Sequence, residues 1–376
     1  METVFTHARI VLDDRIIDGT LVLRDGVIAD VAEGPSQLPA AVDCEGDYLS
    51  PGLIDLHTDA LENHFVPRPK VIWPDARAAA LAHDGQTVAA GITTVFDAIC
   101  AGGFDQTKSA RRDLFTVMLD AVEQTAPWFR ADHRIHLRCE LTDPGLLELA
   151  APELHREKLG LASLMDHTPG ARQWRNVDQL RTYLMGIGKS RAEVDEELAT
   201  RTARGQAAVA ANFDALANLL KDAGVALASH DDTTPEHVAD AKAAGCTISE
   251  FPTTEEAARA AHASGLTTIG GAPNVVRGGS HSGGVAMKDL VGAGLLDALA
   301  SDYVPASMLQ AAAKLFADGL PLNEALALVT SRPAALAGLN DRGRLAPGLR
   351  ADVLRFRLVE GTPVVRDVRV AGAKVF

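Results

Sequence analysis

The sequence has few cysteines, no long apolar run and a shortage of basic residues. Its four cysteines are scattered and include no CxxC pair, and residues 1–9 show no secretory leader, so we expect a reduced, cytoplasmic setting rather than a disulfide framework. No apolar run approaches the roughly 20 residues that a membrane-spanning helix needs. Lys and Arg number 36 against 50 Asp and Glu, for a formal net charge of −14. We therefore expect neither a nucleic acid nor a membrane as partner, because both are anionic.

The chain does contain enough apolar sequence for a large packed core. Of its 376 residues, 47% are hydrophobic, and eight short apolar runs alternate with helical patterns. Such runs are typical of parallel strands buried on both faces. Eight of them predict an α/β fold with a (β/α)8 TIM-like barrel. The runs cover residues 53–59, 93–99, 135–141, 161–167, 225–231, 246–253, 267–273 and 298–303.

The two ends of the chain differ from this body. Short alternating runs separated by turns such as Arg24-Asp25-Gly26 predict antiparallel strands at 2–41. The tail at 344–376 has the same pattern. We therefore expect a small β-sandwich satellite domain built from both termini, 1–50 plus 340–376, beside a barrel domain at 51–339.

Polar residues gather at the carboxyl ends of the predicted strands, where barrel enzymes hold their active sites. His57 and Asp59 are two positions apart, so both side chains face one spot. One such residue alone is more often a hydrogen-bonded structural group or a helix cap, but many at corresponding strand ends favour a shared site. The full set is His57, Asp59, Asp97, Glu140, His167, His230, Asp231, Glu250, Asn274 and Asp302.

Part of this set forms a candidate metal site, and its members are His57, Asp59, Glu140, His167, His230 and Asp302. A carboxylate can bridge two metals and neutral imidazole suits Zn or Mn, so Glu140 with His167 and His230 would complete a mixed nitrogen and oxygen site. One or two divalent ions, Zn, Mn or Mg, are expected. Asp302 faces the first strand across the barrel closure and is the candidate catalytic proton acceptor for a metal-activated water. Its alternative role is a cap for the helix after Pro305.

Two loops that follow strands indicate an anionic substrate. Pro67-Arg68-Pro69-Lys70 presents two cations on a stiff loop. The Gly-rich stretch at 277–283 combines a guanidinium with backbone N–H groups that can approach phosphate oxygens. Each alone is more often a solvated turn or a flexible connector, and attachment to a metal barrel favours the functional reading. The candidate substrate-binding residues are Arg68, Lys70, Asn274, Arg277, Ser280 and His281.

The segment at 168–224 is too long for a plain connection between a strand and the next one. Its helical pattern carries Arg172, Lys189 and Arg191. These residues are compatible with a lid that excludes water or screens substrate charge, and equally with a surface helical insertion.

Over almost its whole length the sequence resembles the amidohydrolase superfamily, although His57-Thr58-Asp59 departs from the usual His-x-His. Its motifs are similar, in order and spacing, to one branch, the α-D-ribose 1-methylphosphonate 5-triphosphate diphosphatases of the bacterial carbon–phosphorus lyase pathway. The motifs are HTDALE at 57–62, PRPK at 67–70, HLRCE at 136–140, LMDHTPG at 164–170, ASHDD at 228–232, EFPTT at 250–254, GAPNVVRGGSHSG at 271–283 and SDY at 301–303.

This resemblance implies metal-dependent hydrolysis of a phosphorylated ribose phosphonate to its 5-phosphate and pyrophosphate. Two other classes stay open. An amidohydrolase or deaminase acting on a cyclic amide or nucleobase would use the same ligands but would leave Arg68, Lys70 and Arg277 without a role. A non-enzymatic binding subunit would be expected to have lost its metal ligands. A homo-oligomer is compatible with the sequence, which does not fix the oligomeric state.

Overall fold

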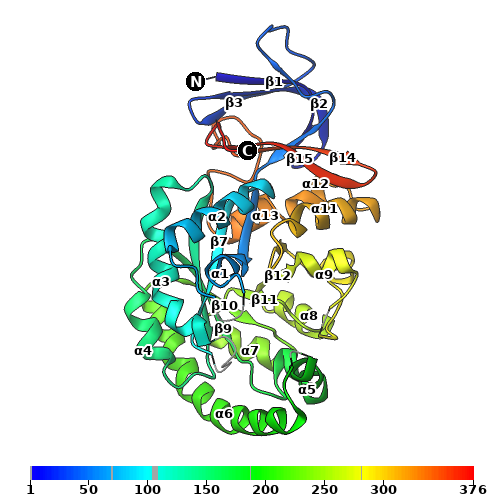
Figure 1. Ribbon diagram of the computed structural model, residues 1–376. Helices are drawn as coiled ribbons and strands as arrows, with labels where there is room; N and C mark the ends of the chain where they lie inside the picture. Colours follow the sequence, from blue (N-terminus) through cyan, green and yellow to red (C-terminus); the bar gives the residue numbers. More distant parts are fainter. Residues whose placement is uncertain (1, 69–70, 104–108, 187, 281) are drawn as a thin grey trace.

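The computed structural model describes residues 2–68, 71–103, 109–186, 188–280 and 282–376 (Figure 1). All eight predicted runs form strands of one parallel sheet, with neighbours in chain order from β6 to β13. The barrel prediction is therefore confirmed. The strands are β6 (Leu53–Thr58), β7 (Ile92–Ala101), β8 (Asp132–Glu140), β9 (Leu159–Met165), β10 (Ala226–His230), β11 (Ile248–Glu250), β12 (Thr267–Gly271) and β13 (Ala298–Ala300).

The barrel closes between its first and last strands at their carboxyl ends. The Asp302 N–H donates to the His57 carbonyl at 2.9 Å, and the Asp59 N–H donates to the Asp302 carbonyl at 2.6 Å. Thr58 and Asp302 form a parallel bridge. The closure itself therefore brings candidate residues 57, 59 and 302 together.

The barrel interior explains why site residues follow apolar ones. Seven strands contribute buried side chains to one cluster: Ile54, Phe96, Leu161, Ala228, Ile248, Ile269 and Ala298. Side chains alternate along a strand, so the residue two positions later faces the same side. Ala228 thus precedes His230, and Ile248 precedes Glu250, at the open end of the barrel.

Helices surround this sheet, and no described helix is both long and apolar enough to cross a membrane. Figure 1 places α5 and α6 at the end of the molecule farthest from the terminal strands. The helices are α1 (Ala60–Phe65), α2 (Ala76–Ala89), α3 (Ser109–Thr125), α4 (Leu146–Ala150), α5 (Val177–Gly186), α6 (Arg191–Asp222), α7 (Pro235–Ala243), α8 (Glu255–Ala263), α9 (Ala272–Arg277), α10 (Met287–Gly292), α11 (Ser307–Ala317), α12 (Leu322–Ala327) and α13 (Ser331–Leu336).

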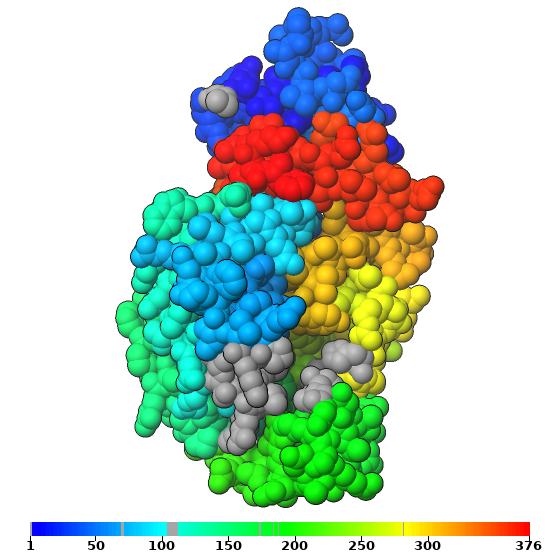
Figure 2. All heavy atoms as spheres, viewed as in Figure 1, coloured from blue at the N-terminus to red at the C-terminus, as the bar shows by residue number. Residues whose placement is uncertain are grey.

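The terminal strands form one mixed sheet, ordered β16-β15-β14-β5-β1-β2-β3, with β4 on β1. The Ile28 N–H donates to the Leu349 carbonyl at 2.8 Å, so β3 at one end of the sheet contacts the segment before β14, around a separate apolar core. The C-terminal strands lie between the N-terminal strands and the barrel (Figure 2). The strands are β1 (Glu2–Val11), β2 (Ile16–Arg24), β3 (Val27–Glu33), β4 (Val42–Asp43), β5 (Tyr48–Pro51), β14 (Val353–Val359), β15 (Thr362–Val370) and β16 (Ala373–Lys374).

Candidate active site

A cavity of about 580 Å³ opens at the carboxyl ends of the barrel strands. All six candidate metal ligands line it: His57, Asp59, Glu140, His167, His230 and Asp302. Helices α5 and α6, from the long segment after the fourth strand, supply part of its wall through Leu180, Leu184 and Arg201. The cavity is thus shared between the barrel and this insertion.

The first group of donors lies at the barrel closure and comprises His57, Asp59 and Asp302, whose ligand atoms lie within 4.8 Å of one another. Asp59 occupies the N-cap position of α1 but its side chain makes no cap hydrogen bond. Its carboxylate instead lies 3.4 Å from His57 Nε2 and 2.6 Å from Arg138 Nη1. Helix α11 begins after Ala306, so Asp302 does not cap it. The Asp59 and Asp302 carboxylates therefore do not cap helices, and both line the cavity.

Glu250 connects His57 of this first group with His230, which belongs to a second group of donors. It is fully buried, and its carboxylate oxygens lie 2.8 Å from His57 Nδ1 and 2.8 Å from His230 Nδ1. Burial opposes its ionisation, but His57 and His136 outweigh burial and hold the pKa of Glu250 well below its usual value. When the imidazole is neutral, a carboxylate that accepts from Nδ1–H leaves the other ring nitrogen, Nε2, with a lone pair toward the cavity.

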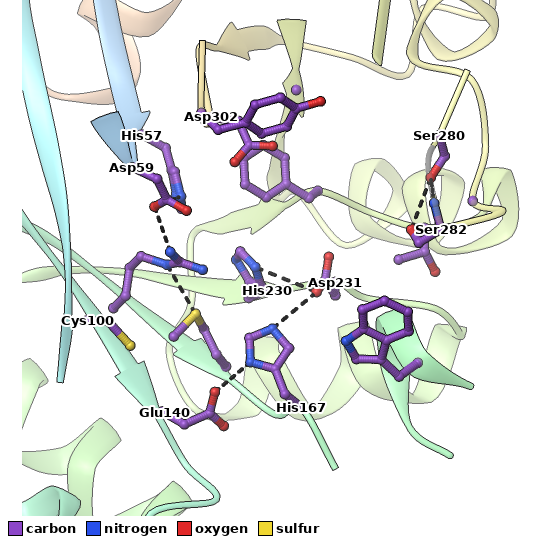
Figure 3. Close-up of a pocket in the computed structure, with 18 of the residues that line it drawn as sticks. His57, Asp59, Cys100, Glu140, His167, His230, Asp231, Ser280, Ser282 and Asp302 are labelled. Atoms are coloured by element: carbon purple, nitrogen blue, oxygen red, sulfur yellow. Dashed lines mark hydrogen bonds and ion pairs between the residues drawn. The ribbon is translucent and has the colours of Figure 1, made fainter. Parts of the chain in front are cut away.

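The second group comprises His167, His230 and Asp231, with ligand atoms again within 4.8 Å of one another (Figure 3). Asp231 Oδ2 lies 3.6 Å from His230 Nε2 and 3.8 Å from His167 Nε2. We expected Glu140 to be a metal ligand together with His167 and His230, and this stays a prediction. Its carboxylate accepts from His167 Nδ1 at 2.5 Å and from the Thr142 hydroxyl at 2.6 Å, so Glu140 supports the ring from behind.

The electrostatics of the site favour a positive charge and leave one carboxyl ready to exchange a proton. Burial disfavours a charged imidazole at His57, yet Glu250 and Asp59 outweigh it and raise the pKa of His57 to about 10. Burial and the Asp59 carboxylate raise the pKa of Asp302 to about 7. A carboxyl group that titrates near neutrality is suited to general acid–base chemistry.

Three strands end in a residue with a left-handed backbone. Asp231, Phe251 and Asp302 have φ values of 56°, 54° and 56°. Non-glycine residues adopt this region at an energetic cost, and such strain gathers at functional sites. Asp231 and Phe251 directly follow β10 and β11, and Asp302 lies two residues after β13. All three residues line the cavity, so three strand ends turn sharply beside it.

The predicted substrate-binding residues divide into two sets. Asn274, Arg277 and Ser280 line the cavity. The Asn274 amide also closes the loop after α9, donating to the Val285 carbonyl at 3.1 Å and accepting from the Met287 N–H at 2.9 Å. Arg68 is exposed and is not part of the described cavity wall. Lys70 and His281 lie outside the described residues.

Comparison with known proteins places the chain in a family. Residues 185–369 match the amidohydrolase family. Over 99% of its length the chain is 43% identical to the α-D-ribose 1-methylphosphonate 5-triphosphate diphosphatase of Escherichia coli (strain K12), all of which is covered. The chain belongs to the amidohydrolase family.

Solved structures share the amidohydrolase fold at low sequence identity. The 5-methylcytosine deaminase of Klebsiella pneumoniae, liganded with 5-fluorocytosine, is similar with a TM-score of 0.68 and 17% identity, covering 100% of this chain and 97% of that one. The N-acetyl-D-glucosamine-6-phosphate deacetylase of Mycobacterium smegmatis is similar with a TM-score of 0.65 and 17% identity, covering 100% of both chains. These two likenesses establish the fold alone.

The site of this amidohydrolase differs from the sequence-based candidate set at particular residues. Asp97 was expected at a strand end, but it lies within β7 beside inward-facing Phe96, so it faces the opposite side and binds His83 of α2 at 2.7 Å. Cys100 lines the cavity at the end of that strand. Arg138 was missed, although its position two residues before Glu140 places both side chains on one face.

Proposed function

We propose that this amidohydrolase hydrolyses α-D-ribose 1-methylphosphonate 5-triphosphate to the 5-phosphate and pyrophosphate, as a hydrolase of phosphonate metabolism. The observation that carries the proposal is the 43% identity that spans 99% of the chain to a diphosphatase of that name. The cavity supports it independently, because carboxylates and imidazoles gather at one side and Arg277 lies on the wall as well.

The donor set fits one or two divalent metal ions. Two buried atoms that face the site, His57 Nε2 and Asp231 Oδ2, have no hydrogen-bond partner among the described residues. Mixed imidazole and carboxylate donors suit Zn or Mn, and Mg is the alternative. We propose His57, Asp59 and Asp302 for one ion and His167, His230 and Asp231 for the other. Such an ion supplies charge stabilisation at phosphoryl oxygens and lowers the pKa of water.

The protein's own groups then hold and orient the reactants. Glu250 fixes the rings of His57 and His230 through Nδ1, and Glu140 fixes His167 in the same way. Arg277 offers a guanidinium to the phosphate chain, where bidentate, charge-assisted hydrogen bonds are strongest. No cysteine nucleophile is needed: Cys139 is fully buried, and burial raises the pKa of its thiol far above neutrality.

Asp302 is the proposed proton acceptor. A water oxygen forms a bond to the α- or β-phosphorus, the bond from that phosphorus to the bridging oxygen breaks, and the bridging oxygen leaves on one of the two products. The water proton passes to the Asp302 carboxylate, which lies at the cavity beside His57 and Asp59.

The test is to incubate the purified, metal-supplemented protein with the ribose triphosphate in ¹⁸O-water and to follow the reaction by ³¹P NMR. We expect pyrophosphate and the 5-phosphate, with the label on one product identifying the phosphorus that is attacked. No pyrophosphate release under any divalent metal would overturn the proposal. Ammonia release from cyclic amides or nucleobases, measured in parallel, would instead favour the deaminase class.

A further inference from the structure

The insertion after the fourth strand forms part of the cavity wall and has its own small apolar core. Helices α5 and α6 pack through Leu180, Leu184, Val194 and Leu198, all buried. Leu180 and Leu184 also line the cavity. The wall is therefore positioned to contact whatever part of a substrate extends away from the strand ends.

The three cations that the sequence suggested for this segment do not face the cavity. Arg172 is buried behind the fifth strand, where its Nη1 donates to the His230 carbonyl at 2.9 Å and to Asp232 at 2.7 Å. Lys189 pairs with Glu197 at 2.5 Å. The Arg191 side chain is 76% exposed. Any charge that the insertion offers to a substrate must come from another residue.

Arg201, on α6, is that residue. It lines the cavity with a side chain that is only 17% exposed. Its Nη2 pairs with Glu197 one turn earlier on the same helix, and its Nε has no hydrogen-bond partner among the described residues. A buried guanidinium with an unused donor is costly unless a ligand or water completes it.

The helix face that carries Arg201 packs closely against the residues that follow the third and fourth strands. One turn later, a Cβ on Gly205 would lie 3.1 Å from Thr168 Oγ1 and 3.4 Å from Thr142 Cγ2. Two turns further on, Asn212 Nδ2 donates to the carbonyls of Leu141 and Asp143 at 2.9 and 2.8 Å. Residues four apart share a helix face. The contacts of Gly205 and Asn212 therefore position Arg201, on the same face, relative to the strand ends.

The Gly-rich loop meets the insertion from the other side of the cavity. A Cβ on Gly283 would lie 3.1 Å from Nε2 of Gln179 on α5, so loop and helix touch. Arg277, the first residue of this Gly-rich stretch, lines the same cavity.

The remaining cavity arginines are engaged at strand ends. Arg112 pairs with Asp143, and Arg138 pairs with Asp59. Within the described wall, Arg201 and Arg277 are the guanidinium groups that have no ion pair with a strand-end carboxylate.

We propose that Arg201 binds the terminal phosphates of the substrate's triphosphate chain, so that the insertion supplies a polyphosphate subsite and a preference for triphosphate over shorter chains. The inference rests on the proposed function for the identity of the substrate. It adds that Arg201 and helix α6 distinguish substrates by the length of their phosphate chain. The strongly negative charge of the whole protein makes such a local cation necessary, because the overall field repels a polyanion.

The experiment compares Arg201→Ala and Arg201→Lys with Arg204→Ala, using metal-loaded protein. Arg204 lies on the same helix, is exposed, and its replacement changes the net charge by the same amount. Steady-state kinetics are measured with the ribose 5-triphosphate and the matching 5-diphosphate. Calorimetry with the magnesium salt of inorganic tripolyphosphate measures binding without turnover, and thermal unfolding checks the fold of each variant.

For Arg201→Ala we expect KM for the triphosphate and Kd for tripolyphosphate to rise by roughly 10- to 100-fold, as for a lost charge-assisted contact. The diphosphate should change less, Arg201→Lys should fall between, and Arg204→Ala should match wild type. Equal tripolyphosphate affinity in Arg201→Ala and Arg204→Ala would overturn the inference even with full diphosphatase activity. If the wild-type protein binds tripolyphosphate through Arg201 but releases no pyrophosphate from the ribose triphosphate, the proposed function is contradicted and the phosphate-binding role of Arg201 is not.

Discussion

Two clusters of histidine and carboxylate side chains lie in the same barrel, and they use their hydrogen bonds in opposite ways. In the first, which we call the closed cluster, Asp97 accepts from His83 at 2.7 Å and from His133 at 2.8 Å, and Asp84 lies 3.4 Å from His133. All four side chains are fully buried. Both oxygens of the Asp97 carboxylate are thus already bound to histidines within the cluster.

Around the second, the open cluster, Glu250 and Glu140 hold the Nδ1 side of each imidazole, and the Nε2 side is left toward the cavity. Its members are His57, Asp59, His167, His230, Asp231 and Asp302. Both clusters combine histidines with carboxylates, but they differ in where these residues lie. Asp97 and His133 lie within β7 and β8, on the side that packs against His83 and Asp84 of α2. The open cluster instead lies at the carboxyl ends of the strands, where it lines the cavity.

The largest expected effect is on the open cluster, from Asp302→Asn. The amide keeps an oxygen toward a cation but cannot accept a proton, so kcat should fall by about 10²–10⁴-fold. Metal content by mass spectrometry and the unfolding temperature should stay close to wild type. A loss of less than about tenfold at saturating substrate would make Asp302 a structural residue.

Next comes Asp97→Asn in the closed cluster, where we expect stability to change and chemistry to persist. Removing one partner from a buried pair typically costs about 3–5 kcal/mol, because the other charge is left uncompensated. The measurement is the free energy of unfolding in urea, with exposed Asp318→Asn as the matched control. A variant with normal stability but no activity per folded molecule would contradict the division into two clusters.

A smaller effect is expected from Glu250→Gln, which sits beneath the open cluster. Replacing a partner that orients metal-binding imidazoles costs on the order of 10–100-fold in metal affinity. Competition with a chelator, followed by metal analysis, measures the loss, and exposed Glu256→Gln is the control. Unchanged metal affinity would mean that Glu250 serves packing and not ligand orientation.

The smallest effect concerns pH and the closed cluster. Burial disfavours a charged His133, but Asp97 and Asp84 outweigh it and raise its pKa to about 9. The folded state therefore binds this proton more tightly than the unfolded chain, so its contribution to stability is full below the unfolded pKa of about 6.5 and is lost as pH rises through 9. We expect Tm to fall across this window by on the order of 2–4 °C for each kcal/mol lost, and Asp97→Asn to flatten the profile. An equally steep profile in that variant would point to other groups.

Much of the fold could be predicted because its signals are local. Eight apolar runs with turn residues between them define eight strands, and a period of two places His57 with Asp59 and Arg138 with Glu140. Asp97 was misplaced because the sequence does not state which face of β7 is inner; Phe96 decides it, and only packing shows that.

The site was harder to predict where it depends on contacts between distant segments. Glu250 was recognised as a strand-end residue, but its role depends on His57, 193 positions earlier. Arg201 was missed among several basic residues of the insertion. Its one local signal was Gly205, a helix-weakening residue inside a 32-residue helix, which marks a face that approaches another part of the chain closely.

The terminal sheet can be completed only after the barrel has been synthesised, because its strands come from both sides of the barrel in the sequence. Asp47 is fully buried, and Arg355, which lies 308 positions later, binds one of its oxygens at 2.6 Å. Arg357 binds the other, and β5 pairs directly with β14. During synthesis the N-terminal strands leave the ribosome long before Arg355, Arg357 and β14 are made. Until the whole barrel has been synthesised, the Asp47 carboxylate therefore has no arginine partner and the edge of β5 is unpaired. Contacts this distant in sequence form slowly, and unpaired edges invite association with other chains. The strands that follow the barrel in the chain are therefore the ones that protect the strands that precede it.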